Sequence, residues 1–229
     1  MSRRAFVFYL RAVQLWDRWR LRRLMRRHPG VYIDPTASSN LASASFKLAD
    51  DARLWIGPHT HTERRAEGLR FELGPGAELV IEGTSWLRSE LQPIHFVLFD
   101  GARMTIGDGS WLNGCHLSAK VSLVAGKGVM IGPGVRVFDA DQHDLDDVTP
   151  ETLAPVRIGD YVWIASDVTI LRGVEVGSHS IVAAQSVVTR SVPPHSMVAG
   201  APASPKGKVG DRQALMEEWR RDFLASVGR

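Results

Sequence analysis

The sequence has one cysteine and no long apolar run, and each shortage excludes a class of protein. Cys115 is the only cysteine among 229 residues, so no intrachain disulfide can form and a reducing compartment is suitable. No stretch approaches the roughly 20 apolar residues that a membrane-spanning helix needs. The first apolar run, Ala5 to Leu10, is too short for the core of a signal peptide. We therefore expect a cytoplasmic protein.

Acidic residues are almost missing from the first 27 positions. This segment holds nine arginines and one acid, Asp17, a balance of +8, whereas the rest of the chain has 19 basic and 24 acidic residues, a balance of −5. The net charge of +3 therefore comes from one end of the chain. No nucleic-acid-binding module accompanies the charge, so we expect no nucleic-acid partner.

Glycine and proline are absent from Arg3 to Arg27, where good helix formers dominate. Apolar side chains recur there at helical spacing, between the arginines: Phe8, Ala12, Leu15, Trp16 and Trp19. We expect an N-terminal basic amphipathic helix within residues 1–30. Two interpretations stay open. Either the helix packs on the end of the main domain with its arginines solvated, or it makes peripheral contact with an anionic membrane or an acidic partner.

The middle of the chain repeats with a period of six residues. Aliphatic residues stand six apart at Ile158, Ile164, Ile170, Val176, Val182 and Val188. A mostly small residue follows each of them. This period fits neither a lone amphipathic helix nor a hairpin, but it is typical of a solenoid built from short strands and turns. We expect the aliphatic side chains to point inward and to stack on those of neighbouring coils.

Weaker copies of the repeat run upstream with irregular spacing, which predicts coils of uneven length. They share an aliphatic residue followed by glycine, as in Ile56-Gly57, Leu73-Gly74, Ile106-Gly107 and Ile131-Gly132. We place the solenoid domain at residues 31–205, with a loop leaving the coil at 138–155, where the period breaks. Residues 206–229 are expected to form a helical tail that caps or braces the solenoid.

These residues resemble the hexapeptide-repeat acyltransferases, the family that includes galactoside, maltose and serine acetyltransferases. The resemblance is strongest from Trp111 to Ala203. Its most specific part reads Ile-Gly-Asp-Tyr-Val-Trp-Ile-Ala-Ser-Asp-Val-Thr-Ile-Leu-Arg-Gly-Val from residue 158 and continues from Ser186 to Ala203. The resemblance implies a mainly β fold, a left-handed parallel β-helix, which is an exception to the usual right-handed crossover. It also implies a homotrimer with active sites between subunits, acetyl-CoA as the acyl donor, and no metal.

His143 is the candidate general base. Acyl transfer to a hydroxyl needs a group that removes the hydroxyl proton, and histidine, with an unperturbed pKa of about 6.5, suits this role. The catalytic histidine of the family occupies the corresponding loop, so the resemblance implies the same role for His143. Asp141 is the candidate for orienting its imidazole and contacting the acceptor, although a backbone carbonyl would orient it equally well. Family members often have proline after the histidine, where this chain has Asp144. The alternative is an exposed loop histidine among acids.

The resemblance also assigns residues to the two substrates. Asn113 is similar to an acceptor-contacting position, and a turn residue or an internal asparagine ladder is the alternative. A backbone N–H from the coil of Ala165 and Ser166 would stabilise the thioester oxygen. The positions implied for coenzyme A run from the pantetheine arm to the phosphates: Trp163, Ala165, Ser166, Ala184, Thr189, Arg190, Lys206 and Lys208.

The expected reaction is O-acetylation of a sugar or polysaccharide hydroxyl by direct attack in a ternary complex. N-acetylation of an amino-sugar or nucleotide-sugar is the alternative chemistry, and a non-catalytic β-helix scaffold is the alternative class. Covalent catalysis by Cys115 is disfavoured, because a small residue is typical filling for a coil. A γ-type carbonic anhydrase would need a cluster of three histidines around a metal. The histidines near the coils are far apart in the sequence, at 116, 143, 179 and 195.

Overall fold

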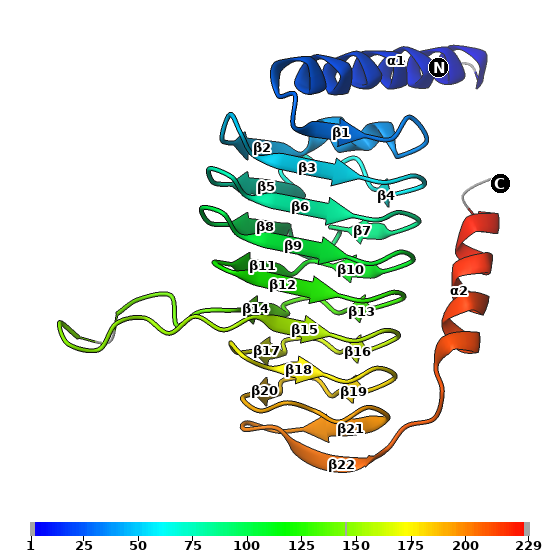
Figure 1. Cartoon of the computed structure of the whole chain (residues 1–229). Coiled ribbons are helices and arrows are strands. Elements are labelled where there is room, and N and C mark those ends of the chain that lie inside the picture. The colour runs from blue at the N-terminus through cyan, green and yellow to red at the C-terminus, as the bar shows by residue number, and fades with distance from the viewer. Residues whose placement is uncertain (1–2, 145, 227–229) are drawn as a thin grey trace.

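The computed structural model describes residues 3–144 and 146–226. Short strands coil into a three-sided solenoid, with one helix across its N-terminal end and another along its flank (Figure 1). The helices are α1 (Arg3–Arg27), a short 3-10 helix (Ser39–Ser43) and α2 (Gln213–Ser226). The expectation of a mainly β fold with a helix at each end is confirmed.

The described strands form three sheets, here called A, B and C. Sheet A contains β1 (Val31–Ile33), β3 (Arg53–Ile56), β6 (Glu78–Ile81), β9 (Arg103–Ile106), β12 (Ser122–Ala125), β15 (Val156–Ile158) and β18 (Glu175–Val176). Sheet B contains β2 (Ser45–Leu48), β5 (Leu69–Leu73), β8 (Ile94–Leu98), β11 (His116–Ala119), β14 (Arg136–Phe138), β17 (Thr169–Ile170) and β20 (Val187–Val188). Sheet C contains β4 (His61–Thr62), β7 (Trp86–Arg88), β10 (Trp111–Asn113), β13 (Met130–Ile131), β16 (Trp163–Ile164), β19 (Ile181–Val182), β21 (Ser196–Ala199) and β22 (Ser204–Lys208).

Each full coil passes through sheets A, C and B in turn and stacks in parallel on the coil before it. In the regular part, Ile158 pairs with Val176, so three six-residue steps close one coil. Upstream coils are longer, since Arg70 pairs with His95. The uneven spacing of the upstream repeats in the sequence therefore reflects differences in coil length. Among the strands of residues 3–144 and 146–226, β22 alone runs antiparallel to its neighbour, and it continues beyond the boundary expected at residue 205.

The aliphatic side chains of the six-residue repeat point inward, as expected. The six positions from Ile158 to Val188 are each no more than 2% exposed. The preceding members of the repeat, such as Val162 and Val168, are buried as well, so each coil contributes to one continuous apolar column. In the longer coils, Phe46, Phe71 and Phe96 stack with ring centroids 5.1 and 5.2 Å apart and fill the wider interior. Because each coil covers the next, the stability of any one coil depends on its neighbours.

The helix α1 packs on the first coil through a face that the sequence pattern did not single out. Leu21 is buried, Leu24 and Met25 pack against the core, and Asp17 is fully buried in an ion pair with Arg64. The apolar side chains that the helical spacing singled out are exposed instead: Phe8, Ala12, Leu15, Trp16 and Trp19. Within residues 3–144 and 146–226, no helix combines the length and apolar character needed to cross a bilayer.

The helix α2 runs back along sheet C and braces it (Figure 1). Arg220 forms an ion pair of 2.9 Å with Asp108 and donates a hydrogen bond to Thr84. Trp219 stacks near Trp111, with 6.5 Å between ring centroids. Buried Met216 anchors the start of the helix. These contacts tie the C-terminal segment to coils far from it in the sequence.

Candidate active site

The candidate residues lie along two different edges of the three-sided solenoid. The first, here called the C–B edge, is formed by the turns that lead from sheet C to sheet B, including residues 165–168 and 183–186. The second, here called the B–A edge, is formed by the turns from sheet B to sheet A, and it carries the loop at 139–155. Figure 1 shows this loop projecting far from the body between β14 and β15.

The C–B edge contains four of the positions implied for coenzyme A. Trp163 is 39% exposed on β16, while its neighbour Ile164 is buried in the core. Ala165 and Ser166 form the following turn, and Ala184 lies exposed in the equivalent turn of the next coil. The coil before also approaches closely: a Cβ on Gly132 would lie 2.8 Å from the Ser166 nitrogen. Only glycine allows this approach, so the backbone of the turn is held in place.

One backbone donor of this turn is open. The Ala165 N–H donates to the Val182 carbonyl at 2.9 Å, so it is already used by the sheet. The Ser166 carbonyl accepts from Gln185, but the Ser166 N–H has no hydrogen-bond partner among the described residues. Of the two donors expected from this coil, only Ser166 is therefore available to stabilise a developing oxyanion.

Trp163 also has a partner that the sequence did not reveal. The guanidinium of Arg212 lies 5.6 Å from the centroid of its ring, within the range of a cation–π contact. Arg212 is itself buried and donates to the Tyr161 carbonyl at 3.1 Å, and this burial lowers its pKa. The segment leading into α2 therefore helps to orient the indole of Trp163.

An open pocket of about 430 Å³ lies on the same edge, lined by Gln92, Pro93, His95, Gly114, Cys115, His116, Gly134, Val135, Arg136 and Asp167. The rings of His95 and His116 are 5.6 Å apart. Burial is the main cause that lowers the pKa of both imidazoles; Arg70 lowers that of His95 further and His95 that of His116, while Glu72 acts in the opposite direction on both. A lowered pKa favours the neutral form of both rings. The pocket offers polar, uncharged rings beside the charged Arg136 and Asp167.

Asn113 ends β10 one residue before Gly114, which lines this pocket. Its Nδ2 donates to the Ile131 carbonyl of the next coil at 3.3 Å. The side chain therefore bonds the backbone of the neighbouring coil from a strand position, which is neither a turn nor an asparagine ladder. Asn113 does not itself line the pocket, and its role in acceptor contact remains a prediction.

The B–A edge holds the loop of His143 through residues that the sequence analysis missed. Asp139 is fully buried, and its carboxylate accepts from the N–H groups of Lys120, Val121 and Ser122, each at 2.7 Å. The Lys120 ammonium contacts both carboxylate oxygens of Glu151 at 2.8 Å. These contacts fasten the two ends of the loop to the solenoid. The signal that could have revealed Asp139 was its place directly after a strand, with an apolar residue on each side.

His143 itself is exposed in this loop. The residue before it, Gln142, has a φ of 78°, and its carbonyl accepts from the Lys120 ammonium at 3.2 Å. A non-glycine residue in this conformation is strained, and strain of this kind persists where surrounding contacts hold it. Lys120 therefore controls the direction in which the chain enters His143.

Asp141 contacts other groups than the one we expected. Its Oδ1 accepts from the Arg172 guanidinium at 2.5 Å and its Oδ2 from the Thr152 N–H at 3.2 Å. The hydrogen bond from Arg172, with the Thr152 bonds and the positive charge of Arg172, lowers the pKa of this carboxyl. Asp141 therefore ties the loop to Arg172 and to the Thr152 backbone. Orientation of the imidazole by Asp141 stays a prediction.

The remaining positions implied for coenzyme A are exposed and lie apart from the C–B edge. Thr189 follows β20 on the B–A edge, where it lines a second pocket with Asp141 and Arg172, and Arg190 comes next. Lys206 and Lys208 lie on β22 at the last coil. Within one chain, Thr189 and Arg190 therefore lie on a different edge of the solenoid from Trp163 and Ser166.

Histidines that are distant in the sequence become neighbours through the coil register. His179 and His195 stack with centroids 4.8 Å apart, and Tyr161 stacks on His179. The Nδ1 of His179 accepts from the Arg212 N–H, so this imidazole has a structural role. The described residues contain no group of three His, Cys, Asp or Glu side chains placed to hold a metal ion.

Comparison with known proteins places these features in a family context. A sequence model described as bacterial transferase hexapeptide (six repeats) matches residues 155–190. Nodulation protein L of Rhizobium meliloti is 35% identical over 184 residues, covering 76% of this chain and 90% of that protein. Galactoside O-acetyltransferase of Escherichia coli is 33% identical over 94 residues, 40% of this chain and 46% of the relative. The chain spans about half the length of several curated relatives that it matches.

Among solved structures, a polysialic acid O-acetyltransferase has a TM-score of 0.64 with 19% identity. The similarity covers 80% of this chain and 87% of that one. At this identity the likeness concerns the fold alone, and it extends the match well beyond the regular repeat to the uneven coils upstream.

Proposed function

Because this chain belongs to the hexapeptide-repeat family of bacterial transferases, we propose that it transfers an acetyl group from acetyl-CoA to a hydroxyl of a sugar or polysaccharide. The observation that carries the proposal is the turn after Trp163, where the open N–H of Ser166 lies on the same edge as a polar pocket. An open backbone donor is what a thioester oxygen requires when it becomes an oxyanion. The proposed location is the cytoplasm, because a reducing compartment suits a chain with a single cysteine.

His143 is proposed as the general base. Its imidazole accepts the proton of the acceptor hydroxyl while the oxygen attacks the thioester carbonyl carbon. The Ser166 N–H stabilises the oxyanion of the tetrahedral intermediate. Collapse of the intermediate breaks the carbon–sulfur bond, and the departing thiolate receives the proton from the imidazolium. The acetyl ester and free coenzyme A are the products.

Direct transfer is favoured over an acyl-enzyme. Cys115 is buried at 3% exposure, and this burial raises the pKa of its thiol. A thiol held in the neutral form is a poor nucleophile, because the thiolate is the reactive species. Replacement of Cys115 by serine is therefore expected to leave the chemistry intact.

A complete site is proposed to need two chains. The loop of His143, with Thr189 and Arg190, lies on the B–A edge, whereas Trp163, Ser166 and Ala184 lie on the C–B edge. A left-handed coil assembled as a homotrimer would set the B–A edge of one subunit against the C–B edge of the next. Each interface would then hold one site.

The acceptor is proposed to be a sugar because the open pocket presents the side chains of His95, His116 and Arg136, which are suited to hydroxyl groups. Relatives named for sugar O-acetylation agree with this choice. N-acetylation of an amino-sugar uses the same geometry, and the chemical nature of the product decides between the two.

The test is release of free thiol from acetyl-CoA by the purified protein with a panel of sugars, nucleotide-sugars and oligosaccharides. His143→Ala is expected to lower kcat by about 10²- to 10⁴-fold, the usual contribution of a general base. His195→Ala is the matched control, because this exposed histidine stacks only on His179 at another edge. Mass spectrometry of the product distinguishes an ester from an amide.

Acceptor-dependent release that persists undiminished in His143→Ala would exclude His143 as the base. A protein that does not bind acetyl-CoA at all would favour the scaffold alternative over an enzyme.

A further inference from the structure

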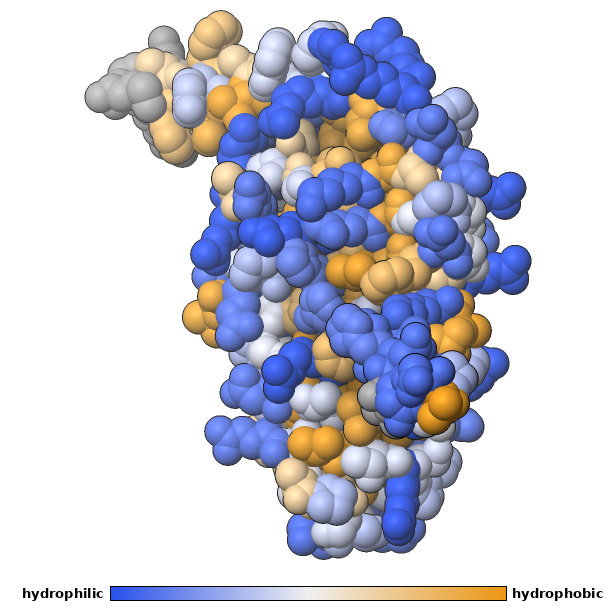
Figure 2. Space-filling view, turned by 90° about the vertical axis from the view of Figure 1, so that its left-hand side faces the viewer, coloured by the Kyte–Doolittle hydropathy of each residue, from blue (hydrophilic) through white to orange (hydrophobic). Residues whose placement is uncertain are grey.

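The N-terminal half of α1 has no place in the proposed reaction and lies largely exposed. Leu21 and the residues after it pack on the first coil, but Phe8 is 76% exposed, Leu15 72% and Trp16 57%. Figure 1 shows the N-terminal part of the helix extending past the first coil, and in Figure 2 that end projects from the body with apolar side chains on it. Several large exposed apolar side chains on one projecting element are unusual for a surface that faces only water.

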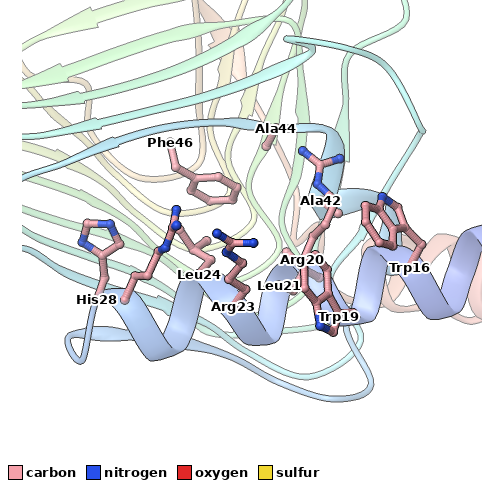
Figure 3. Close-up of a pocket in the computed structure, with 11 residues that line it drawn as sticks. Trp16, Trp19, Arg20, Leu21, Arg23, Leu24, His28, Ala42, Ala44 and Phe46 are labelled. Atoms are coloured by element: carbon pink, nitrogen blue, oxygen red, sulfur yellow. The ribbon is translucent and has the colours of Figure 1, made fainter.

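A groove of about 420 Å³ continues this surface between α1 and β2. Its apolar part is formed by Trp16, Trp19, Leu24 and Phe46, and the two indoles stack with centroids 4.8 Å apart. Figure 3 shows the arginine side chains of the helix standing beside these apolar residues. Arg20, Arg23 and Arg27 line the groove, and the Arg23 guanidinium lies 5.5 Å from the Trp19 ring centroid.

The positive charge of this element is not neutralised on the helix. Residues 1–27 carry nine arginines and one acid, and that acid, Asp17, is already paired with Arg64 of the solenoid. Burial and the neighbouring charge of Arg22 lower the pKa of Arg18, which agrees with crowding of like charges. The rest of the chain carries −5, so the net positive charge is confined to this end.

We propose that α1 and the groove beside it dock on the surface of a bilayer that contains anionic phospholipids. The aromatic side chains enter the boundary between headgroups and acyl chains, where tryptophan is favoured, and the arginines bind the phosphates. A second copy of α1 fits the charge less well, because it would bring +8 against +8. The helix would then lie in the plane of the membrane and hold the first coil of the solenoid against it. This inference does not depend on acetyl transfer.

The test is flotation of the full-length protein with vesicles of phosphatidylcholine alone and of phosphatidylcholine mixed with phosphatidylglycerol. We expect binding to the anionic vesicles, weakened by added salt, and little binding to the neutral ones. The triple variant Arg20→Gln, Arg23→Gln, Arg27→Gln should bind roughly a hundredfold more weakly, since each basic residue near an anionic surface contributes about a factor of five. All three side chains are exposed, so the fold should tolerate the change.

The matched control is Arg53→Gln with Arg103→Gln, which removes exposed positive charge from sheet A and should float like the wild type. The variant Trp16→Ser with Trp19→Ser tests the apolar part and should also lose binding. Failure of the wild type to float with anionic vesicles would overturn the proposal. A change in oligomeric mass in the Trp16 and Trp19 variant would overturn it too, because the groove would then belong to a contact between subunits.

Discussion

At the scale of single residues, the loop of His143 shows how much of a catalytic position is set by side chains outside it. Lys120 reaches the Gln142 carbonyl and the Glu151 carboxylate, and its ammonium lies 4.9 Å from the Phe99 ring centroid. Its side chain is only 18% exposed, so these interactions are shielded from solvent. Lys120 is therefore a positioning residue, which acts on the proposed base through the backbone of Gln142.

Lys120→Met tests this role. The variant keeps the aliphatic stem but removes the charge, so the loop loses its fastening while the solenoid core stays filled. We expect kcat to fall about 10- to 100-fold with the KM for acetyl-CoA nearly unchanged, because small misplacement of a catalytic group is costly. Lys127→Met, at an exposed turn of the solenoid, is the control. A normal kcat with a raised KM for acetyl-CoA would contradict the assignment.

At the scale of elements, the attachment of α1 depends on a buried charge as well as on apolar packing. Asp17 has no exposed surface, and Arg64, whose side chain is 44% exposed, is its partner. Leu21 alone among the large apolar side chains of the helix is fully enclosed. The helix is therefore held by its C-terminal half, and its projecting half is free to meet another surface.

Asp17→Ala is expected to loosen α1 from the solenoid. The cost should be about 1–3 kcal/mol, less than for a fully buried pair, because the half-exposed Arg64 regains water. Since local opening exposes the many arginines of the helix, trypsin should cleave within residues 3–27 roughly 5- to 100-fold faster. Asp50→Ala, at an exposed turn, is the control. Equal cleavage rates in the Asp17 variant and the wild type would show that the ion pair does not hold the helix.

At the scale of the whole molecule, the separation of the two edges predicts that activity is a property of the assembly. His143→Ala damages the B–A edge, and Ala184→Trp blocks the C–B edge. Each variant should be inactive alone. Trimers formed from an equal mixture should recover roughly a quarter of the wild-type activity, the fraction of interfaces that combine an intact edge from each neighbour.

The control for this experiment is a mixture of His143→Ala with His143→Gln, which offers no intact B–A edge and should stay inactive. Sedimentation should give a mass three times the 25.3 kDa of one chain. Recovery that never exceeds that of the control mixture would place the whole site within one subunit.

The solenoid could be predicted from the sequence alone, because its period of six is local. Each aliphatic residue from Ile158 to Val188 stacks on the corresponding residue of the neighbouring coil. The inward-facing positions could therefore be predicted from their spacing. The resemblance to the family could be recognised because its motifs, Trp163 to Ser166 and the loop of His143, are also local in the sequence. Helix formation in α1 was equally readable, since residues 3–27 contain neither glycine nor proline.

Which surfaces meet could not be predicted in the same way, because it depends on contacts between distant parts of the chain. The packing face of α1 depends on the position of Arg64, the partner of Asp17, which lies 47 positions further along the chain. Likewise, Arg172 donates a hydrogen bond to Asp141 from 31 positions away in the chain, and Lys120 reaches the Gln142 carbonyl from 22 positions away. Coil register, not sequence distance, brought His179 beside His195. Such contacts depend on the number of residues in each coil. Because the upstream coils differ in length, a fixed period in the sequence does not reveal that number.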